Sequence, residues 1–206
     1  FNQGQVCCAG SRLLVQESVK ERFLAKVKAR MAKLVSGDSL DKNIDMGALV
    51  DESQRSRIAS LVALGAQEGG VVWQPDTPMP TTGCYYPPTI ITDVEPASTL
   101  AQEEIFGPVL VVSSFRTPAE SVALANNSRY GLAVSLWTEN INLALDIAPK
   151  IKAGVVWVNC TNVFDAAAGF GGYRESGFGR EGGKEGLFEY VKPRWEAQLS
   201  TSPVLK

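Results

Sequence analysis

Between residues 109 and 159 the sequence alternates segments typical of strands with segments typical of helices. The segments are 109–115, 118–126, 132–138, 140–151 and 155–159, the second and fourth of them helical. A helix between two strands is the usual crossover that joins a parallel pair. The alternation therefore predicts an α/β fold with a twisted, mostly parallel, open sheet and flanking helices. In such sheets, functional residues gather at the carboxyl ends of the strands.

The first half of the chain adds three strands and two helices to this prediction. The strands are expected at 12–16, 71–74 and 89–94. Ser18 and Glu21 form a capping box that predicts the start of one helix. The apolar stripe of that helix is Val19, Phe23, Val27, Met31 and Leu34. Asp51 is expected to begin a second helix that ends before Gly69, and the proline-rich residues 75–88 are expected to be irregular.

The composition gives no reason to expect nucleic acid or a membrane as a partner. The formal net charge is −2 and the sequence pI is about 5.3, so the chain lacks the basic surface that attracts polyanions. Its apolar runs are short and interrupted by glycine, proline or charge, and no membrane-spanning helix is predicted. With 206 residues, 45% of them hydrophobic, the chain is long enough for one main α/β domain.

Cysteine and histidine usage limits the chemistry further. The chain has four cysteines and no histidine; Cys7 and Cys8 are adjacent, while Cys84 and Cys160 stand alone. This spacing does not match a zinc site, so no metal is expected. Cysteines without a disulfide framework fit a reducing, cytoplasmic location. Without histidine, any base for a cysteine nucleophile must be a carboxylate, a lysine or a group outside these residues.

The opening residues 1–12 place the two adjacent thiols between glycines and uncharged amides, a composition typical of a loop. A cysteine is nucleophilic as the thiolate, and its pKa falls where the N–H groups of a helix start point at the sulfur. The run from Gly4 to Gly10 could supply such a start. A packed, unreactive thiol is the alternative for Cys7 and for Cys8, and the residues alone leave both alternatives open.

Two further segments near the end of the chain stand out. Residues 169–172 and 177–179 form a glycine-rich bend that lacks the preceding strand and following acidic residue of a dinucleotide-binding fingerprint. Close backbone packing is therefore expected there, and not a phosphate site. Residues 191–200 are expected to form an edge strand or arm, because Pro193 argues against a central strand.

The segment from Gly4 to Cys7, with its flanks, resembles the active-site cysteine signature of the aldehyde dehydrogenase superfamily. Other motifs of that family follow in the same order, namely EEIFGPV at 103–109, ANN through YGL at 125–132, WVN at 157–159 and FGG at 170–172. The resemblance implies that Cys7 is the catalytic cysteine. It also implies that Cys8 occupies a neighbouring position that the family fills variably.

The resemblance further implies where a NAD or NADP cofactor would bind. Glu104 takes the position of a glutamate that holds the nicotinamide-side ribose, and Phe106 that of a phenylalanine beside the cofactor. Gln54 matches a second position that contacts the same ribose. A carboxylate can accept hydrogen bonds from both hydroxyls of a ribose, and an aromatic face can restrain a planar ring. Packing in the core is the alternative role for Phe106.

Three more residues match positions that border the aldehyde tunnel of the family. They are Asn159, Phe164 and Phe170. Aromatic walls would exclude water and favour an apolar aldehyde, and plain loop packing is their alternative role. Gly169 departs from the family, which commonly has proline at this position, and the departure is expected to loosen the tunnel wall.

The implied reaction is NAD(P)-dependent oxidation of an aldehyde to a carboxylic acid through a thiohemiacetal and a thioester on Cys7. In the family, a dinucleotide-binding domain that binds most of the cofactor, an oxyanion-stabilising asparagine and a general-base glutamate precede the cysteine motif. The chain therefore resembles an excised catalytic half that is expected to lack turnover by itself. Residues 1–185 are expected to form the catalytic domain, and residues 186–206 an oligomerisation arm of a homodimer.

The cysteine pair, residues 83–88 and residues 187–193 additionally resemble the long family-sixteen branch of these enzymes. Two other functions stay open at this point. One is a scaffold that keeps the fold without catalysis, and the other is a relative that transfers the acyl group to coenzyme A instead of water.

Overall fold

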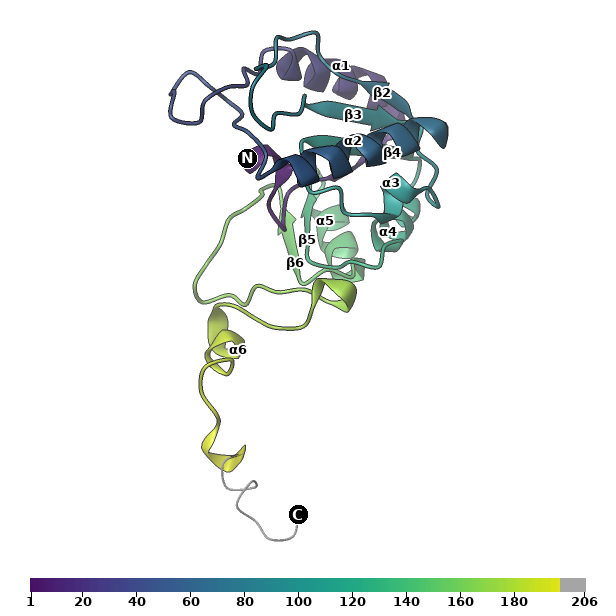
Figure 1. Ribbon diagram of the computed structural model, residues 1–206. Helices are drawn as coiled ribbons and strands as arrows, with labels where there is room; N and C mark the ends of the chain where they lie inside the picture. The colour runs from purple at the N-terminus through teal and green to yellow at the C-terminus, as the bar shows by residue number, and fades with distance from the viewer. Residues whose placement is uncertain (197–206) are drawn as a thin grey trace. The chain divides into compact units, whose positions relative to one another are not determined.

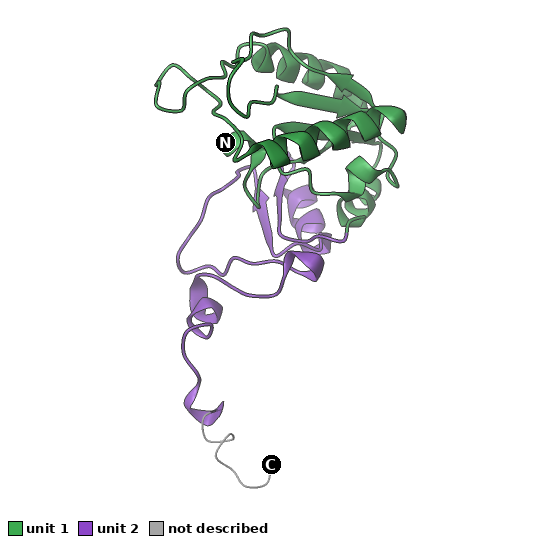
Figure 2. Cartoon of the chain, viewed as in Figure 1, with its two compact units in different colours: residues 1–128 green, residues 129–206 purple. Residues whose placement is uncertain are grey.

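The computed structural model describes residues 1–196 and divides the chain into two compact units, the N-terminal unit (residues 1–128) and the C-terminal unit (residues 129–206) (Figures 1 and 2). The N-terminal unit contains η1 (Asn2–Gly4), β1 (Arg12–Gln16), η2 (Glu17–Val19), α1 (Lys20–Met31), α2 (Glu52–Gln67), β2 (Val71–Trp73), β3 (Thr89–Thr92), α3 (Thr99–Gln102), β4 (Val109–Phe115) and α4 (Pro118–Asn126). The C-terminal unit contains β5 (Ala133–Leu136), α5 (Ile141–Ile147), η3 (Ala148–Lys150), β6 (Val155–Val158), η4 (Arg174–Ser176) and α6 (Gly183–Leu187).

The sheet of the N-terminal unit has four strands in the order β1-β4-β3-β2. β4 pairs in parallel with β1 and with β3, and β2 is an antiparallel edge strand. The register aligns Arg12 with Val111 on one side of β4, and Ile91 with Val111 on the other. The predicted mostly parallel α/β sheet is therefore confirmed.

Alternating side chains of the central strands build a core on each face of this sheet. Val109 and Val111 of β4 belong to the cluster that includes Ile58 of α2, whereas Val112 belongs to the cluster that includes Leu24 of α1. Successive residues of a strand point to opposite faces. α1 and α2 therefore cover opposite faces of the sheet, as Figure 1 shows. Ile58 has no exposed surface, so water is excluded between α2 and the sheet at this residue.

The C-terminal unit contains a second, smaller sheet made of β5 and β6. The two strands are parallel, with Ala133 aligned to Val155 and Leu136 aligned to Val158. α5 lies between them in the sequence and buries Ala144 and Ile147. The chain order strand, helix, strand is thus the predicted crossover unit. After β6 the chain runs through a long segment without strands to α6.

The start of α1 differs from the predicted one. Ser18 lies inside the short helix η2, and α1 begins at Lys20 after Val19, which makes no side-chain capping bond. The predicted stripe advanced by four residues at each step from Val19 to Met31, and each such step drifts by about 40° around a helix. Leu24 is the buried residue of α1, and Phe23 of the predicted stripe is 42% exposed.

No helix within residues 1–196 is long and apolar enough to cross a membrane, and no group of three or more potential metal ligands occurs there. Residues 191–196, the described part of the predicted edge strand, form no strand. Residues 197–206, which are 10 of the 21 residues of the predicted arm (186–206), lie outside the described part of the chain, so the arm from residue 186 stays a prediction.

Candidate active site

The loop that carries Cys7 packs directly against the loop between α3 and β4. Gly4 has φ +73°, and a Cβ built on it would overlap the carbonyl oxygen of Gly107 and lie 2.7 Å from the carbonyl carbon. A Cβ on Gly107 would in turn lie 3.0 Å from Cγ1 of the buried Ile58. Glycine is the residue that tolerates both a positive φ and so close a backbone approach. The two loops are therefore in direct contact through backbone atoms.

Short-range hydrogen bonds fold the cysteine loop into tight turns. The N–H of Ala9 donates to the carbonyl of Val6 at 2.9 Å, so Cys7 and Cys8 are the two central residues of a turn. The side-chain oxygen of Gln5 accepts from the N–H of Val50 at 3.0 Å and ties the loop to the start of α2. Cys7 is an exposed free thiol, whereas Cys8 is half-buried. Burial, followed by the charge of Cys7, raises the pKa of Cys8.

The first turns of α2 hold the loop that follows α3. α2 begins because the side chain of Asp51 accepts from the N–H of Gln54 at 2.7 Å. The side-chain amide of Gln54 donates to the carbonyls of Ile105 and Phe106 at 3.1 and 2.9 Å. Arg57, one turn further along α2, donates to the carbonyls of Ile105 and Glu104, both at 2.9 Å. Three consecutive carbonyls are thus bound by two side chains of one helix.

Exposure alternates along this loop. Ile105 and Gly107 are buried, and Glu104 and Phe106 are exposed. Phe106 has φ +56°, a left-handed conformation that costs a bulky residue on the order of 1–3 kcal/mol. The bonds from α2 offset this cost and keep the glutamate and phenylalanine side chains on the outside. The structure thus brings together Gln54, Glu104 and Phe106, which the sequence placed in one group.

An aromatic cluster in the C-terminal unit contains two of the predicted tunnel residues. Phe164 meets Trp157 and Phe170 edge to face, with ring centroids 5.4 Å and 5.1 Å apart. The indole N–H of Trp157 donates to the carbonyl of Val163 at 2.9 Å and fixes the start of the loop. Phe164 is nevertheless 57% exposed, so one side of the ring remains accessible. An apolar surface of this kind suits an apolar ligand.

Asn159, the third predicted tunnel residue, ends β6 with φ +54°. Its side-chain oxygen accepts from the N–H of Thr138 at 2.9 Å, and its amide donates to the carbonyl of Thr138 at 2.8 Å. These two bonds connect the chain after β6 to the chain after β5, beyond the last backbone pair of the two strands. Asn159 therefore stabilises the end of the small sheet from which the aromatic loop departs.

A comparison with known families matches residues 1–195 to the aldehyde dehydrogenase family. This chain belongs to the aldehyde dehydrogenase family.

Individual relatives are also named as aldehyde dehydrogenases, and their sequences match almost the whole chain. The human mitochondrial aldehyde dehydrogenase is 42% identical over 93% of the chain, which corresponds to 37% of the relative. The mitochondrial benzaldehyde dehydrogenase of Antirrhinum majus is 41% identical over 93% of the chain and 36% of the relative. The chain thus spans well under half the length of these relatives.

A solved structure shows the same fold. The crystal structure of betaine aldehyde dehydrogenase from Staphylococcus aureus in complex with NAD+ matches with a TM-score of 0.89 and 39% sequence identity. The match covers 93% of this chain and 39% of the other. The parallel sheet and its flanking helices are therefore the aldehyde dehydrogenase catalytic fold.

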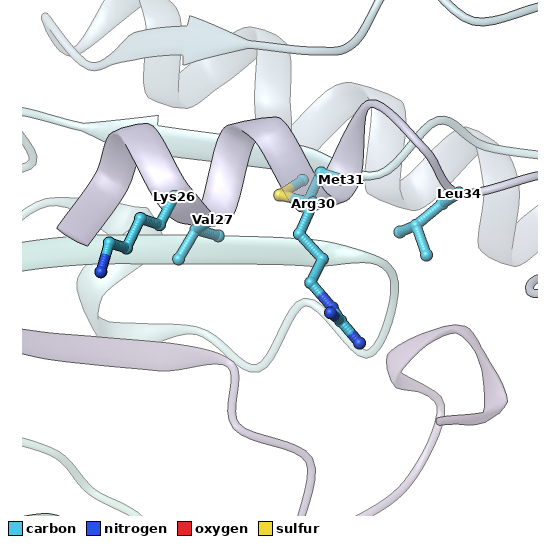
Figure 3. Close-up of a pocket in the computed structure, with 5 residues that line it drawn as sticks. All are labelled: Lys26, Val27, Arg30, Met31 and Leu34. Carbon is cyan, nitrogen blue, oxygen red and sulfur yellow. The ribbon is translucent and has the colours of Figure 1, made fainter. Parts of the chain in front are cut away.

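A hollow elsewhere in this chain is not part of the candidate site. Figure 3 shows the hollow beside α1, lined by Lys26, Val27, Arg30, Met31 and Leu34. α1 covers the face of the sheet opposite α2, so the hollow and the loop held by α2 are separated by the sheet. Its lining also offers no thiol or carboxylate for chemistry on an aldehyde.

Sequence reasoning missed two residues that hold predicted site residues in place, one in each unit. Arg57 was not singled out, although it lies three positions after Gln54 and so on the same face of α2. Trp157 was noted only as part of a motif, yet it supports Phe164. A search along helix spacing could have found Arg57, whereas the contact between Trp157 and Phe164 depends on the path of the loop.

Proposed function

We propose that this chain carries the catalytic cysteine of an NAD(P)-dependent aldehyde dehydrogenase, with Cys7 as the nucleophile. The observation that carries the proposal is the backbone contact between Gly4 and Gly107. It joins the loop of the exposed thiol to the loop that exposes Glu104 and Phe106. A thiol and a cofactor site must be held together for a hydride to leave a carbon bound to that thiol.

The residues on the loop after α3 fit the nicotinamide side of a dinucleotide. Glu104 is an exposed carboxylate that can accept hydrogen bonds from both hydroxyls of a ribose. Phe106 is an exposed ring, 37% accessible, that can pack beside a planar group. When bound, NAD or NADP supplies an acceptor for a hydride. Gln54 acts in this proposal through the loop, because its amide donates to the carbonyls of Ile105 and Phe106.

Cys7 supplies the covalent chemistry. Its thiolate adds to the aldehyde carbonyl and forms a carbon–sulfur bond, and the negative charge moves to the carbonyl oxygen, which the N–H of Cys7 helps to stabilise. Loss of a hydride from this thiohemiacetal leaves a thioester on the sulfur. Water then adds to the thioester, the carbon–sulfur bond breaks, and a carboxylic acid and the free thiol result. A base for that water is expected from residues that relatives carry outside the matched region.

The substrate is proposed to be an aldehyde with an apolar side chain. The exposed ring of Phe164, held between Trp157 and Phe170, offers an apolar surface near the end of β6. Benzaldehyde is named for one relative, and betaine aldehyde, which carries a charge, for a structural neighbour. The aromatic cluster favours the first kind for this chain.

The test is the formation of NADH by the complete gene product with a panel of short, long and aromatic aldehydes. NADH formation that Cys7→Ala abolishes and Cys8→Ala largely preserves is the expected result. Equal loss in the two variants would overturn the assignment of the nucleophile. NADH formation that depends on added coenzyme A would identify a CoA-acylating aldehyde dehydrogenase, and folded, cofactor-binding protein without any NADH formation would indicate a scaffold. Residues 1–206 alone are expected to give no turnover.

A further inference from the structure

Arg57 of α2 lies outside the family motifs, and its guanidinium binds the loop that follows α3. Its two terminal nitrogens each donate to a different carbonyl, one to Ile105 and the other to Glu104, both at 2.9 Å. The guanidinium is planar and its donors have a fixed spacing, so it can hold two neighbouring carbonyls at once. A lysine at the same place would carry the charge without that geometry.

The neighbours of Arg57 make the loop depend on it. Gln54 shares the carbonyl of Ile105, and Ile58 packs against Gly107. The carbonyl of Glu104 receives its bond from Arg57. Between these contacts lies Phe106 in its left-handed conformation. A strained residue keeps such a conformation only where the surroundings impose it.

We propose that Arg57 is a positioning residue for the dinucleotide. By holding the carbonyls of Glu104 and Ile105, it fixes the loop in the conformation that exposes the carboxylate of Glu104 and the ring of Phe106. Arg57 thereby sets the affinity for the nicotinamide-side ribose without contacting the reacting atoms. This inference rests on the function proposed above, because it needs a dinucleotide at that loop.

The size of the effect follows from the population of the competent loop. When a protein binds a ligand only in one conformation, the apparent dissociation constant rises by the inverse of the fraction in that conformation. Loss of two charge-assisted hydrogen bonds is expected to lower this fraction to about one tenth, since Gln54 and Ile58 still hold part of the loop. The dissociation constant of NAD+ and its KM are then about tenfold higher in Arg57→Ala.

The matched control is Arg55, two residues earlier on the same helix. Arg55 pairs with the carboxylate of Glu52 through two bonds of 2.8 Å, so its removal changes helix charge equally and leaves the loop untouched. Arg55→Ala is therefore expected to keep the wild-type affinity for NAD+. Arg57→Lys retains the charge and the aliphatic part of the side chain but not the planar guanidinium. Its affinity for NAD+ is expected to lie between those of wild type and Arg57→Ala.

The experiment measures, for the complete gene product and these three variants, the dissociation constant of NAD+, KM for NAD+ and for the aldehyde, and hydrogen exchange of residues 104–107 without cofactor. The proposal predicts weaker NAD+ binding, unchanged KM for the aldehyde and faster exchange in Arg57→Ala, with Arg55→Ala like wild type. Equal NAD+ affinity in Arg57→Ala and Arg55→Ala would overturn it. If Arg57→Ala does not fold, the same comparison between Arg57→Lys and Arg55→Ala decides.

Failure of the proposed function leaves a different pattern. Wild-type protein that binds neither NAD+ nor NADP+ would refute the dinucleotide site, and faster exchange of residues 104–107 in Arg57→Ala would then show that Arg57 holds the loop for another purpose. Wild-type protein that binds NAD+ while Arg57→Ala matches Arg55→Ala would refute only the role of Arg57.

Discussion

Replacing Gly4 by alanine is expected to displace the catalytic loop with little effect on the rest of the fold. At φ +73° an alanine costs about 1–2 kcal/mol more than glycine. Its Cβ would also overlap the carbonyl of Gly107, which already accepts the N–H of Val109 at 2.8 Å and belongs to a residue packed against the buried Ile58. The cysteine loop must therefore move by on the order of 1 Å, and a displacement of that size can lower the rate about a hundredfold.

Gly10→Ala is the control for this prediction. Gly10 lies on the other side of Cys7, and a Cβ at this position meets nothing within 4 Å. In the complete gene product, kcat for aldehyde oxidation is expected to fall about a hundredfold in Gly4→Ala and less than about threefold in Gly10→Ala. Thermal unfolding, measured in parallel, separates a displaced loop from a lost fold. Equal kcat in the two folded variants would refute the contact between Gly4 and Gly107 as the element that joins the two loops.

Three further predictions concern the cap of α2, the second thiol and the aromatic cluster. Asp51→Ala removes the acceptor of the Gln54 N–H bond and is expected to lower the free energy of unfolding by about 1 kcal/mol in urea titrations; an unchanged value would contradict the cap. Burial and the neighbouring Cys7 raise the pKa of Cys8, so the midpoint for its alkylation by iodoacetamide is expected at a higher pH than in an unfolded peptide of the same sequence, and a midpoint at the same pH would contradict this. Phe164→Ala is expected to raise KM for aromatic aldehydes more than for acetaldehyde, and an equal rise for both would argue against an apolar substrate wall.

The central sheet was predictable because its strands and crossovers carry local signals. β1, β4 and α4 have the bounds that the sequence predicted, since β-branched runs and the Thr117–Pro118 helix start are local features. α3 was not predicted, because a helix of four residues is too short to show a periodic pattern. The predicted helix over residues 140–151 is divided into α5 and η3, since Pro149 has no N–H to continue the α-helical bonding.

The members of the candidate site came from family motifs, and their arrangement came from the structure. Nothing near Gly4 in the sequence indicates that it contacts Gly107, because that contact joins residues on either side of α1 and α2. The role of Asn159 as a bridge to Thr138 was likewise hidden, since an asparagine at a strand end fits many roles. The positive φ of Phe106 is visible only in the folded loop.

The measurement that tests the central claim most directly is the location of the acyl group during turnover. The complete gene product is mixed with NAD+ and an aromatic aldehyde, quenched in acid within the first turnover, and cleaved with trypsin. Fragmentation of the peptide that ends at Arg12 distinguishes Cys7 from Cys8. The account predicts the acyl group on Cys7. An acyl group on Cys8, or NADH formation with neither cysteine acylated and Cys7→Ala fully active, would contradict it.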